Sequence, residues 1–221
     1  MKLLILILAN DNATYLPMQK LWQTYMNTHP HVKSYFIKYN QNLQDNVVLY
    51  NDTIFVKGQE SFVPGCLDKT IKSIEYVLKN FEFDFIFRTN MSSVVDLNIL
   101  YKLLNKDIEC SGVIGDCGGQ KFVSGAGILI SKDTCKLLIY MKSSLNYNVL
   151  DDVSIGEFLV KNNINIKPLT RFDVLNYHNN INFITKESIH DFYHFRCKTD
   201  DNNNNTFFFM KHIIKLLYNV N

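Results

Sequence analysis

The fold is first indicated by the stretch Leu3-Leu4-Ile5-Leu6-Ile7-Leu8-Ala9, which ends at the polar residues Asn10-Asp11-Asn12. A short apolar run bounded by polar residues is typical of a buried strand. The run is shorter than the roughly 18 apolar residues of a membrane helix, and no small-residue cleavage site follows it. We therefore expect a buried first strand here, rather than a secretory signal or a transmembrane segment.

Strand-like and helix-like segments alternate along the rest of the chain. The expected strands lie at 32–39, 52–56, 83–88 and 127–130, and the expected helices at 15–26, 67–78, 97–104, 134–141, 153–161 and 207–218. In 67–78, apolar residues recur every three and four positions, which is the period of an amphipathic helix. This alternation predicts an α/β fold with a mixed, mainly parallel sheet flanked by helices. Ligands then bind at the carboxyl ends of the strands.

The composition is that of an ordinary globular protein. The 221 residues, of which 47% are hydrophobic and 20% charged, predict a single domain spanning 1–221. A net charge of +2 does not favour a nucleic-acid partner. The five cysteines are odd in number and contain no Cys-x-x-Cys pair, so we expect reduced thiols and a cytoplasmic location. The polar run 200–205 is expected to form a surface loop.

Signatures of common nucleotide-binding and hydrolytic sites do not occur in the sequence. The cluster Gly115-x-x-Gly118-Gly119 is not set between a strand and a helix, as a dinucleotide loop is, and no Gly-Lys-Ser/Thr phosphate loop occurs. Ser124-Gly125 lacks the preceding Gly-x of a hydrolase elbow. The missing phosphate loop counts against a nucleotide-dependent regulator or phosphotransferase, which is the competing hypothesis outside the family described next.

Four segments occur in an order that resembles a known family. They are Glu60-Ser61-Phe62 leading to Leu67-Asp68-Lys69-Thr70, then Phe85-Ile86-Phe87-Arg88-Thr89-Asn90, then Phe122–Asp133 with Ser124-Gly125-Ala126-Gly127, and then Leu150-Asp151-Asp152-Val153. This order and spacing, over roughly residues 50 to 165, resemble glycosyltransferase family 31, which includes the fringe and β-1,3-galactosyltransferase enzymes. They also resemble the small GT-A enzymes that some large DNA viruses use to glycosylate capsid proteins.

The resemblance implies a GT-A (Rossmann-like) fold and an inverting glycosyltransferase. A sugar would move from a nucleotide-diphosphate donor, a UDP-sugar, to a hydroxyl of a glycan or glycoprotein acceptor. For a viral protein, the cytoplasmic location would be the host cytosol. The alternative is a catalytically inactive module of the same fold that only binds a nucleotide sugar or a glycan.

Asp152 is the predicted general base, and Asp151 beside it is the second catalytic candidate. In the family, the last acid of this motif opens a helix and removes the proton of the acceptor hydroxyl, which is a task for a positioned carboxylate. The positive end of the helix dipole favours an ionised carboxylate there. The alternative is that Asp151 or Asp152 only caps the helix, which is a common use of aspartate.

The segment Arg88-Thr89-Asn90-Met91-Ser92 stands where the family carries its acidic metal-binding triplet. Asn90 and Ser92 replace the two acids, and neutral oxygens bind a hard cation more weakly than carboxylates do. We therefore expect a donor site that works without a metal, with the family's Mn²⁺ (or Mg²⁺) as the alternative. If a metal binds, Asn90, Ser92 and His194 are its candidate ligands. The segment also fits an inactive family member, or a strand end that faces solvent.

Three basic residues alternate near the C-terminus in Tyr193-His194-Phe195-Arg196-Cys197-Lys198. In an extended chain, His194, Arg196 and Lys198 share one face. The family uses a histidine in this region to reach the metal or the diphosphate, and Arg and Lys can neutralise a leaving diphosphate directly. A solvated strand with Phe195 turned inward fits the pattern equally well.

The remaining site residues are predicted from position. The resemblance places the nucleotide near the end of the first strand and near a lysine of the 67–78 helix, and the acceptor near the Ser-Gly-Ala element. The polar residues after the first strand would also fit an ordinary turn, and the lysine of the 67–78 helix would also fit an exposed surface position. The residues are, for the nucleotide sugar, Asn10, Asp11, Tyr15, Lys69, Arg88, Thr89, Asn90, Ser92, His194, Arg196 and Lys198, and, for the acceptor side, Ser124, Gly125 and Ala126.

Overall fold

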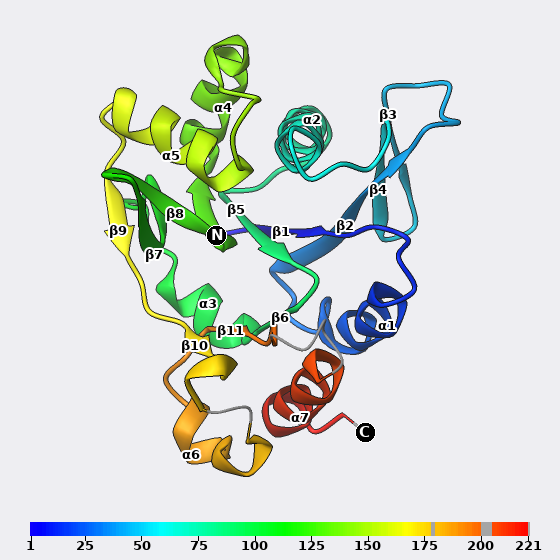
Figure 1. Cartoon of the computed structure of the whole chain (residues 1–221), viewed down its shortest axis with the longest axis vertical. Helices are drawn as coiled ribbons and strands as arrows, with labels where there is room; N and C mark the ends of the chain where they lie inside the picture. Colours follow the sequence, from blue (N-terminus) through cyan, green and yellow to red (C-terminus); the bar gives the residue numbers. More distant parts are fainter. Residues whose placement is uncertain (178–179, 200–204, 221) are drawn as a thin grey trace.

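The computed structural model describes residues 1–177, 180–199 and 205–220, and the predicted surface loop at 200–205 lies, apart from Asn205, outside this range. Within it, one large sheet has the strand order β3-β4-β2-β1-β5-β8-β7-β9 (Figure 1). The strands are β1 Leu3–Leu8, β2 Val32–Asn40, β3 Val47–Tyr50, β4 Thr53–Lys57, β5 Phe85–Asn90, β7 Cys110–Cys117, β8 Gln120–Ser131 and β9 Ile166–Pro168. The centre, β4-β2-β1-β5, is parallel, while β3, β7 and β8 pair with antiparallel neighbours. The predicted α/β class with a mainly parallel sheet is confirmed.

Helices cover both faces of this sheet, and a small sheet lies on one of them (Figure 1). The helices are α1 Tyr15–Tyr25, α2 Gly65–Asn80, α3 Leu97–Leu103, α4 Lys132–Tyr140, α5 Asp151–Lys161, α6 Lys186–Ile189 and α7 Thr206–Tyr218, with short 3-10 turns at Lys142–Ser144, Val174–Tyr177 and Ile181–Phe183. The small sheet joins β10 Phe172–Asp173, β11 His194–Arg196 and β6 Ser93–Val95.

The first strand shows why the sheet has two covered faces. Leu3, Ile5 and Ile7 pack into the cluster that contains α1, α3, α7 and the small sheet. Leu4 and Leu6 pack into the other cluster, with α2, α4 and α5. Side chains of a strand alternate between faces, so a strand covered on both sides is apolar at every position. The uninterrupted run 3–9 is explained in this way.

The expected glycine-rich turns form a long hairpin. Strands β7 and β8 pair antiparallel, and the turn between them uses Gly118 (φ 63°) and Gly119 (φ 86°), a backbone conformation that glycine adopts without strain. Strand β8 is therefore longer than the expected strand at 127–130. The short strands β3, β6, β9 and β10 were not predicted.

The topology brings several chain segments to one edge of the large sheet. Strands β1 and β5 run parallel with Leu8 opposite Asn90, so their carboxyl ends are adjacent. Gly127 of β8 pairs with Thr89, which places the preceding residues of β8 beside the end of β5. Strand β6 follows β5 and pairs with β11, with Ser93 opposite Arg196. The predicted site residues therefore converge at this edge.

Candidate functional site

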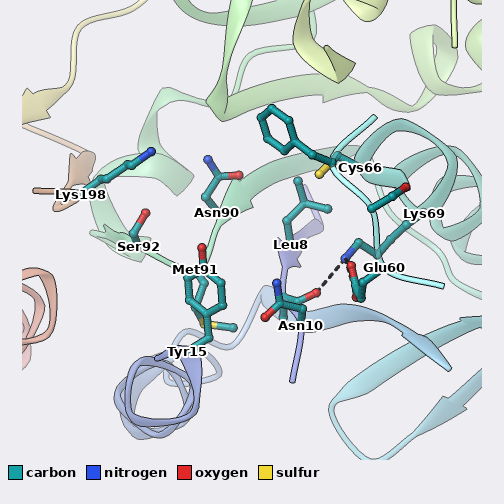
Figure 2. Close-up of a pocket in the computed structure, with 13 residues that line it drawn as sticks. Leu8, Asn10, Tyr15, Glu60, Cys66, Lys69, Asn90, Met91, Ser92 and Lys198 are labelled. Atoms are coloured by element: carbon teal, nitrogen blue, oxygen red, sulfur yellow. Dashed lines mark hydrogen bonds and ion pairs between the residues drawn. The ribbon is translucent and has the colours of Figure 1, made fainter. Parts of the chain in front are cut away.

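Two adjoining cavities, of about 420 Å³ and 210 Å³, lie at the carboxyl ends of β1 and β5. We call them the first and the second cavity. Both are lined by Leu8, Phe62, Cys66, Asn90, Ser92 and Lys198, so they form one continuous cleft. In the first cavity, Lys198 lies at the end opposite Lys69 and Glu60 (Figure 2).

The cleft collects most of the predicted site residues. Those that line one or both cavities are Asn10, Tyr15, Lys69, Arg88, Asn90, Ser92, Ser124, Gly125, Ala126, Asp151, Asp152, Arg196 and Lys198. Asn10 and Tyr15 belong to the first cavity, and the two aspartates and the Ser-Gly-Ala element belong to the second. The predicted donor side and the predicted acceptor side are thus neighbouring parts of one cleft.

Asp151 and Arg88 form a buried ion pair at the second cavity. Arg88 Nη2 donates to Asp151 Oδ2, and the residues are 2% and 8% exposed. Arg88 Nη1 also donates to Asn90 Oδ1 at 3.3 Å. The sequence predicted Asp151 as a catalytic candidate, with helix capping as the alternative. Leu150 occupies the N-cap position of α5 instead, and Asp151 neutralises the arginine that stands at the predicted metal motif.

Of the two neighbouring aspartates, Asp152 is the one that is partly exposed. Its Oδ2 accepts a hydrogen bond of 2.9 Å from the Gly125 backbone N–H, and its Oδ1 accepts one of 3.0 Å from Val153 N–H. It stands in the first turn of α5, where the helix dipole favours its negative charge. These contacts hold the carboxylate in one orientation while leaving it open to the second cavity.

Gly125 allows strand β8 to approach both charged groups. A Cβ atom at this position would lie 2.8 Å from Arg88 Nη1 and 3.1 Å from Asp152 Oδ2. Any larger side chain would push the guanidinium or the carboxylate aside. The Ser-Gly-Ala element thus shapes the charged wall of the second cavity, and its place on the acceptor side stays a prediction.

Lys69 lines the first cavity, but its charge is already neutralised. Its Nζ donates to Ala9 O at 2.8 Å and to both carboxylate oxygens of Glu60, at 3.0 Å and 2.9 Å, and the residue is 3% exposed. A surface helix lysine was the ordinary alternative, and it is wrong. Lys69 joins the end of β1 to the loop before α2 and has little charge left for a phosphate.

Three predicted donor residues do not line either cavity. Asp11 Oδ1 lies 2.8 Å from Lys38 Nζ, and Asp11 lines a separate hollow beside β2 and β4. Thr89 is buried and donates its hydroxyl to Ala126 O at 2.6 Å, so it joins β5 to β8. His194 is the third. These positions correct the sequence-based prediction, because a residue near a strand end contacts the cleft only if packing leaves its side chain free.

His194 lies beneath the cleft rather than in it. The residue is 0% exposed, its ring packs edge-on against Phe87, and its Nε2 lies 3.1 Å from Ser93 Oγ. Burial, with smaller contributions from Arg171 and Arg196, lowers the pKa of His194 to about 3. The imidazole is therefore neutral at physiological pH, so it supplies no charge to a diphosphate. A Cβ at Gly127 would lie 2.7 Å from this ring.

Arg196 and Lys198 are the basic residues that reach the cleft. Asp173 holds Arg196 Nη1 at 3.4 Å and Arg171 Nε at 2.9 Å, so one carboxylate is shared by two guanidinium groups. Among the described residues, no carboxylate pairs with Lys198. Within the described part of the chain, the end of the cleft next to β11 therefore carries a surplus of positive charge.

Arg171 and Asp173 were missed by the sequence-based prediction. Arg171 Nη1 donates to Ser124 Oγ at 2.7 Å, so these two residues connect the Ser-Gly-Ala element to Arg196. Arg171 directly precedes the two-residue strand β10 and Asp173 is its last residue, and this strand is too short to leave a periodic pattern in the sequence. The alternation Arg-x-Asp was the only available signal, and many exposed segments share it.

The residues at the predicted metal motif do not fit a divalent cation. His194 is buried outside the cleft, and Asn90 and Ser92 offer only neutral oxygens. The adjacent carboxylate, Asp151, already neutralises Arg88. Hard cations prefer several carboxylate oxygens, whereas the second cavity offers one unpaired carboxylate, Asp152, beside guanidinium and ammonium groups.

No protein-family model matches the chain, and no curated protein matches it by sequence. Solved structures do match its fold. A glycosyltransferase involved in glycosylation of the major capsid of PBCV-1 has a TM-score of 0.61 at 12% identity, over 96% of this chain and 99% of that one. The galactosyltransferase LgtC has a TM-score of 0.52 at 13% identity, over 95% of this chain and 94% of LgtC. The glycosyltransferase GlyE of Streptococcus pneumoniae TIGR4 has a TM-score of 0.55 at 14% identity, and the match covers 96% of this chain but only 60% of GlyE.

These similarities confirm the predicted GT-A fold. At such low identity, they carry no residue roles. The resemblance to glycosyltransferase family 31 stays a prediction, because none of these three structures tests it. Among the described residues, no helix is both long and apolar enough to cross a membrane.

Proposed function

We propose that the protein is an inverting glycosyltransferase that uses a nucleotide-diphosphate sugar, with a UDP-sugar as donor and a glycan or glycoprotein as acceptor. The observation that carries this proposal is the arrangement of charge in the cleft. An oriented, accessible carboxylate, Asp152, lies on one wall, and the cationic groups of Arg196 and Lys198 lie in the same cavity. Together they offer a proton acceptor for the attacking group and counter-charges for the leaving group.

The proposed reaction is a single displacement. Asp152 takes the proton of the acceptor hydroxyl as the acceptor oxygen forms a bond to the anomeric carbon. The bond between that carbon and the diphosphate oxygen breaks, and its electron pair leaves with the nucleoside diphosphate. Arg196 and Lys198 stabilise the charge that develops on the leaving group, as preorganised cations do in phosphate chemistry. Asn10 follows β1 and Tyr15 begins α1, and both line the first cavity. We propose that these two residues contact the nucleoside.

A catalytically inactive module of the same fold is the second candidate. The observation that favours it is the neutral pair Asn90 and Ser92 at the metal motif. The inactive module would bind a nucleotide sugar or a glycan, and only the transferase turns a donor over.

Nucleotide binding is the first expected result. A nucleoside diphosphate that binds only the folded protein stabilises it by mass action, by about 2.7 kcal/mol at a concentration of 100 Kd. We expect UDP to raise the melting temperature more than GDP or TDP does, and the corresponding UDP-sugar to be hydrolysed slowly. A panel of UDP-, GDP- and TDP-sugars, followed by thermal shift and by release of the diphosphate, measures both. An unchanged melting temperature with all three nucleotides at millimolar concentration would count against the proposal, and binding without any turnover would support the inactive module.

Metal removal is the second expected result. Because Asn90 and Ser92 replace the two acids of the metal motif, and guanidinium and ammonium groups line the same cavity, UDP affinity should largely survive EDTA. Titration calorimetry with and without EDTA, at constant ionic strength, measures this, and Arg196→Gln serves as the comparison that should weaken binding under both conditions. Complete loss of UDP binding in EDTA, restored by Mn²⁺, would show that this part of the proposal is wrong.

A further inference from the structure

Two large apolar side chains are exposed in the cleft. Phe62 is 72% exposed and lines both cavities, and Leu150 is 41% exposed and lines the second. Single exposed apolar residues are common on protein surfaces, but apolar side chains inside a cleft with convergent polar groups are typical of a ligand site. These two side chains are therefore expected to contact part of a substrate.

Both residues stand at loops that border the predicted base. Phe62 lies in the loop between β4 and α2, and Leu150 is the N-cap residue of α5, directly before Asp151 and Asp152. Asp152, Asn90 and Ser124 are among the polar residues of the second cavity, together with Arg196 and Lys198. A ligand here therefore contacts polar groups in the cavity and the exposed apolar side chains at its border.

The proposed nucleoside contacts do not account for both apolar side chains. Asn10 and Tyr15 line only the first cavity, whereas Leu150 lines only the second, beside Asp152. The acceptor must present a hydroxyl to Asp152 and can only arrive from the solvent side. A pyranose ring does both, because its hydroxyls lie around its edge while its C–H groups form an apolar face. The negative face of an aromatic ring attracts such C–H groups, in addition to the gain from burial.

The geometry points to an acceptor subsite for a sugar ring, in which Phe62 packs against the C–H face and Leu150 contacts the opposite border of the same ring. This inference rests on the proposed function and deepens it, since it assigns the acceptor to the saccharides rather than to serine or threonine side chains of a peptide. Sequence reasoning had included Phe62 in a motif without giving it a role.

Saturation-transfer NMR tests the subsite without turnover. The probes are methyl glycosides of glucose, galactose, N-acetylglucosamine, xylose and fucose, added to the protein with and without UDP. We expect saturation of the ring C–H protons of at least one glycoside. Phe62→Ala should weaken its binding by about tenfold, and Phe62→Tyr should restore it, because most of the ring contact is kept. Phe183→Ala removes a phenyl ring of similar exposure, 58%, that does not line either cavity, and should change nothing.

Each alternative has its own outcome. Equal glycoside binding by wild type and Phe62→Ala overturns the inference, as does the absence of binding by all five glycosides. Phe62-dependent binding of a serine- and threonine-containing peptide, without any glycoside binding, overturns it in favour of a peptide acceptor. A loss of UDP affinity in Phe62→Ala would assign the ring to the donor instead. Failure of UDP binding in the wild type would sink the proposed function, while the titration without UDP still decides the subsite.

Discussion

Replacing Asp152 with asparagine is expected to lower the transfer rate by about 10²–10⁴-fold, which is the usual contribution of a general base. Asparagine has nearly the same size and can still accept a hydrogen bond from Gly125 N–H, but it cannot take the proton of the acceptor hydroxyl. Nucleotide affinity should change little, because Asp152 lines the second cavity and not the first. The measurement is the initial transfer rate, with UDP affinity and melting temperature determined on the same samples.

The matched control is Glu157→Gln, which removes one negative charge from the same helix at a position that does not line the cleft. Its transfer rate should stay at the wild-type level. Near-normal transfer by Asp152→Asn would remove the base from the mechanism. A parallel fall in rate and melting temperature would assign Asp152 to the support of α5 instead, and the melting temperature of the control shows how much the loss of one charge costs this helix.

Replacing Arg88 with methionine is expected to lower the free energy of unfolding by about 3–5 kcal/mol, because it leaves the Asp151 carboxylate buried without its partner. Methionine fills much of the space of the arginine stem, so most of the effect comes from the charge. Urea denaturation of the variant, with the slope m compared with that of the wild type, measures the change. Transfer should fall as well, because Arg88 lies against the glycine that positions Asp152.

The double variant Arg88→Met/Asp151→Asn separates charge from packing. Once both charges are gone, no uncompensated ion remains, so the double variant should be more stable than the sum of the two single effects predicts. Lys136→Met, which breaks the exposed pair with Asp133, is the comparison and should produce a change too small to resolve. Additive effects of Arg88→Met and Asp151→Asn would show that the two side chains are not energetically coupled.

Local sequence was sufficient for the main elements of the fold. The run 3–9, the amphipathic segment 67–78 and the alternation of the two kinds of segment correctly predicted β1, α2 and the α/β class. Hydrophobic periodicity depends only on which side of an element is buried, so it can be recognised without knowing the neighbour. The short strands β6 and β10 were missed, because two or three residues do not establish a period.

The order of the motifs predicted which segments meet, and it placed Asp152, Asn90, Arg196 and Lys198 in one cleft. It did not predict which charges remain available there. Lys69, Arg88 and Asp11 have the right residue types, and each is neutralised by a partner that lies 9, 63 or 27 positions away in the chain. Pairing across such separations depends on how the elements pack.

Local patterns were therefore enough to predict the class of fold, the order of the elements and the segments that supply the cleft. Packing between distant segments is what buries His194 in its neutral form, pairs Asp151 with Arg88 and leaves Asp152 accessible. It also decided that Arg171 and Asp173 connect Ser124 to Arg196. The physical reason is that the charge and exposure of a side chain depend on what packs against it, and those contacts come from residues that are distant in the chain.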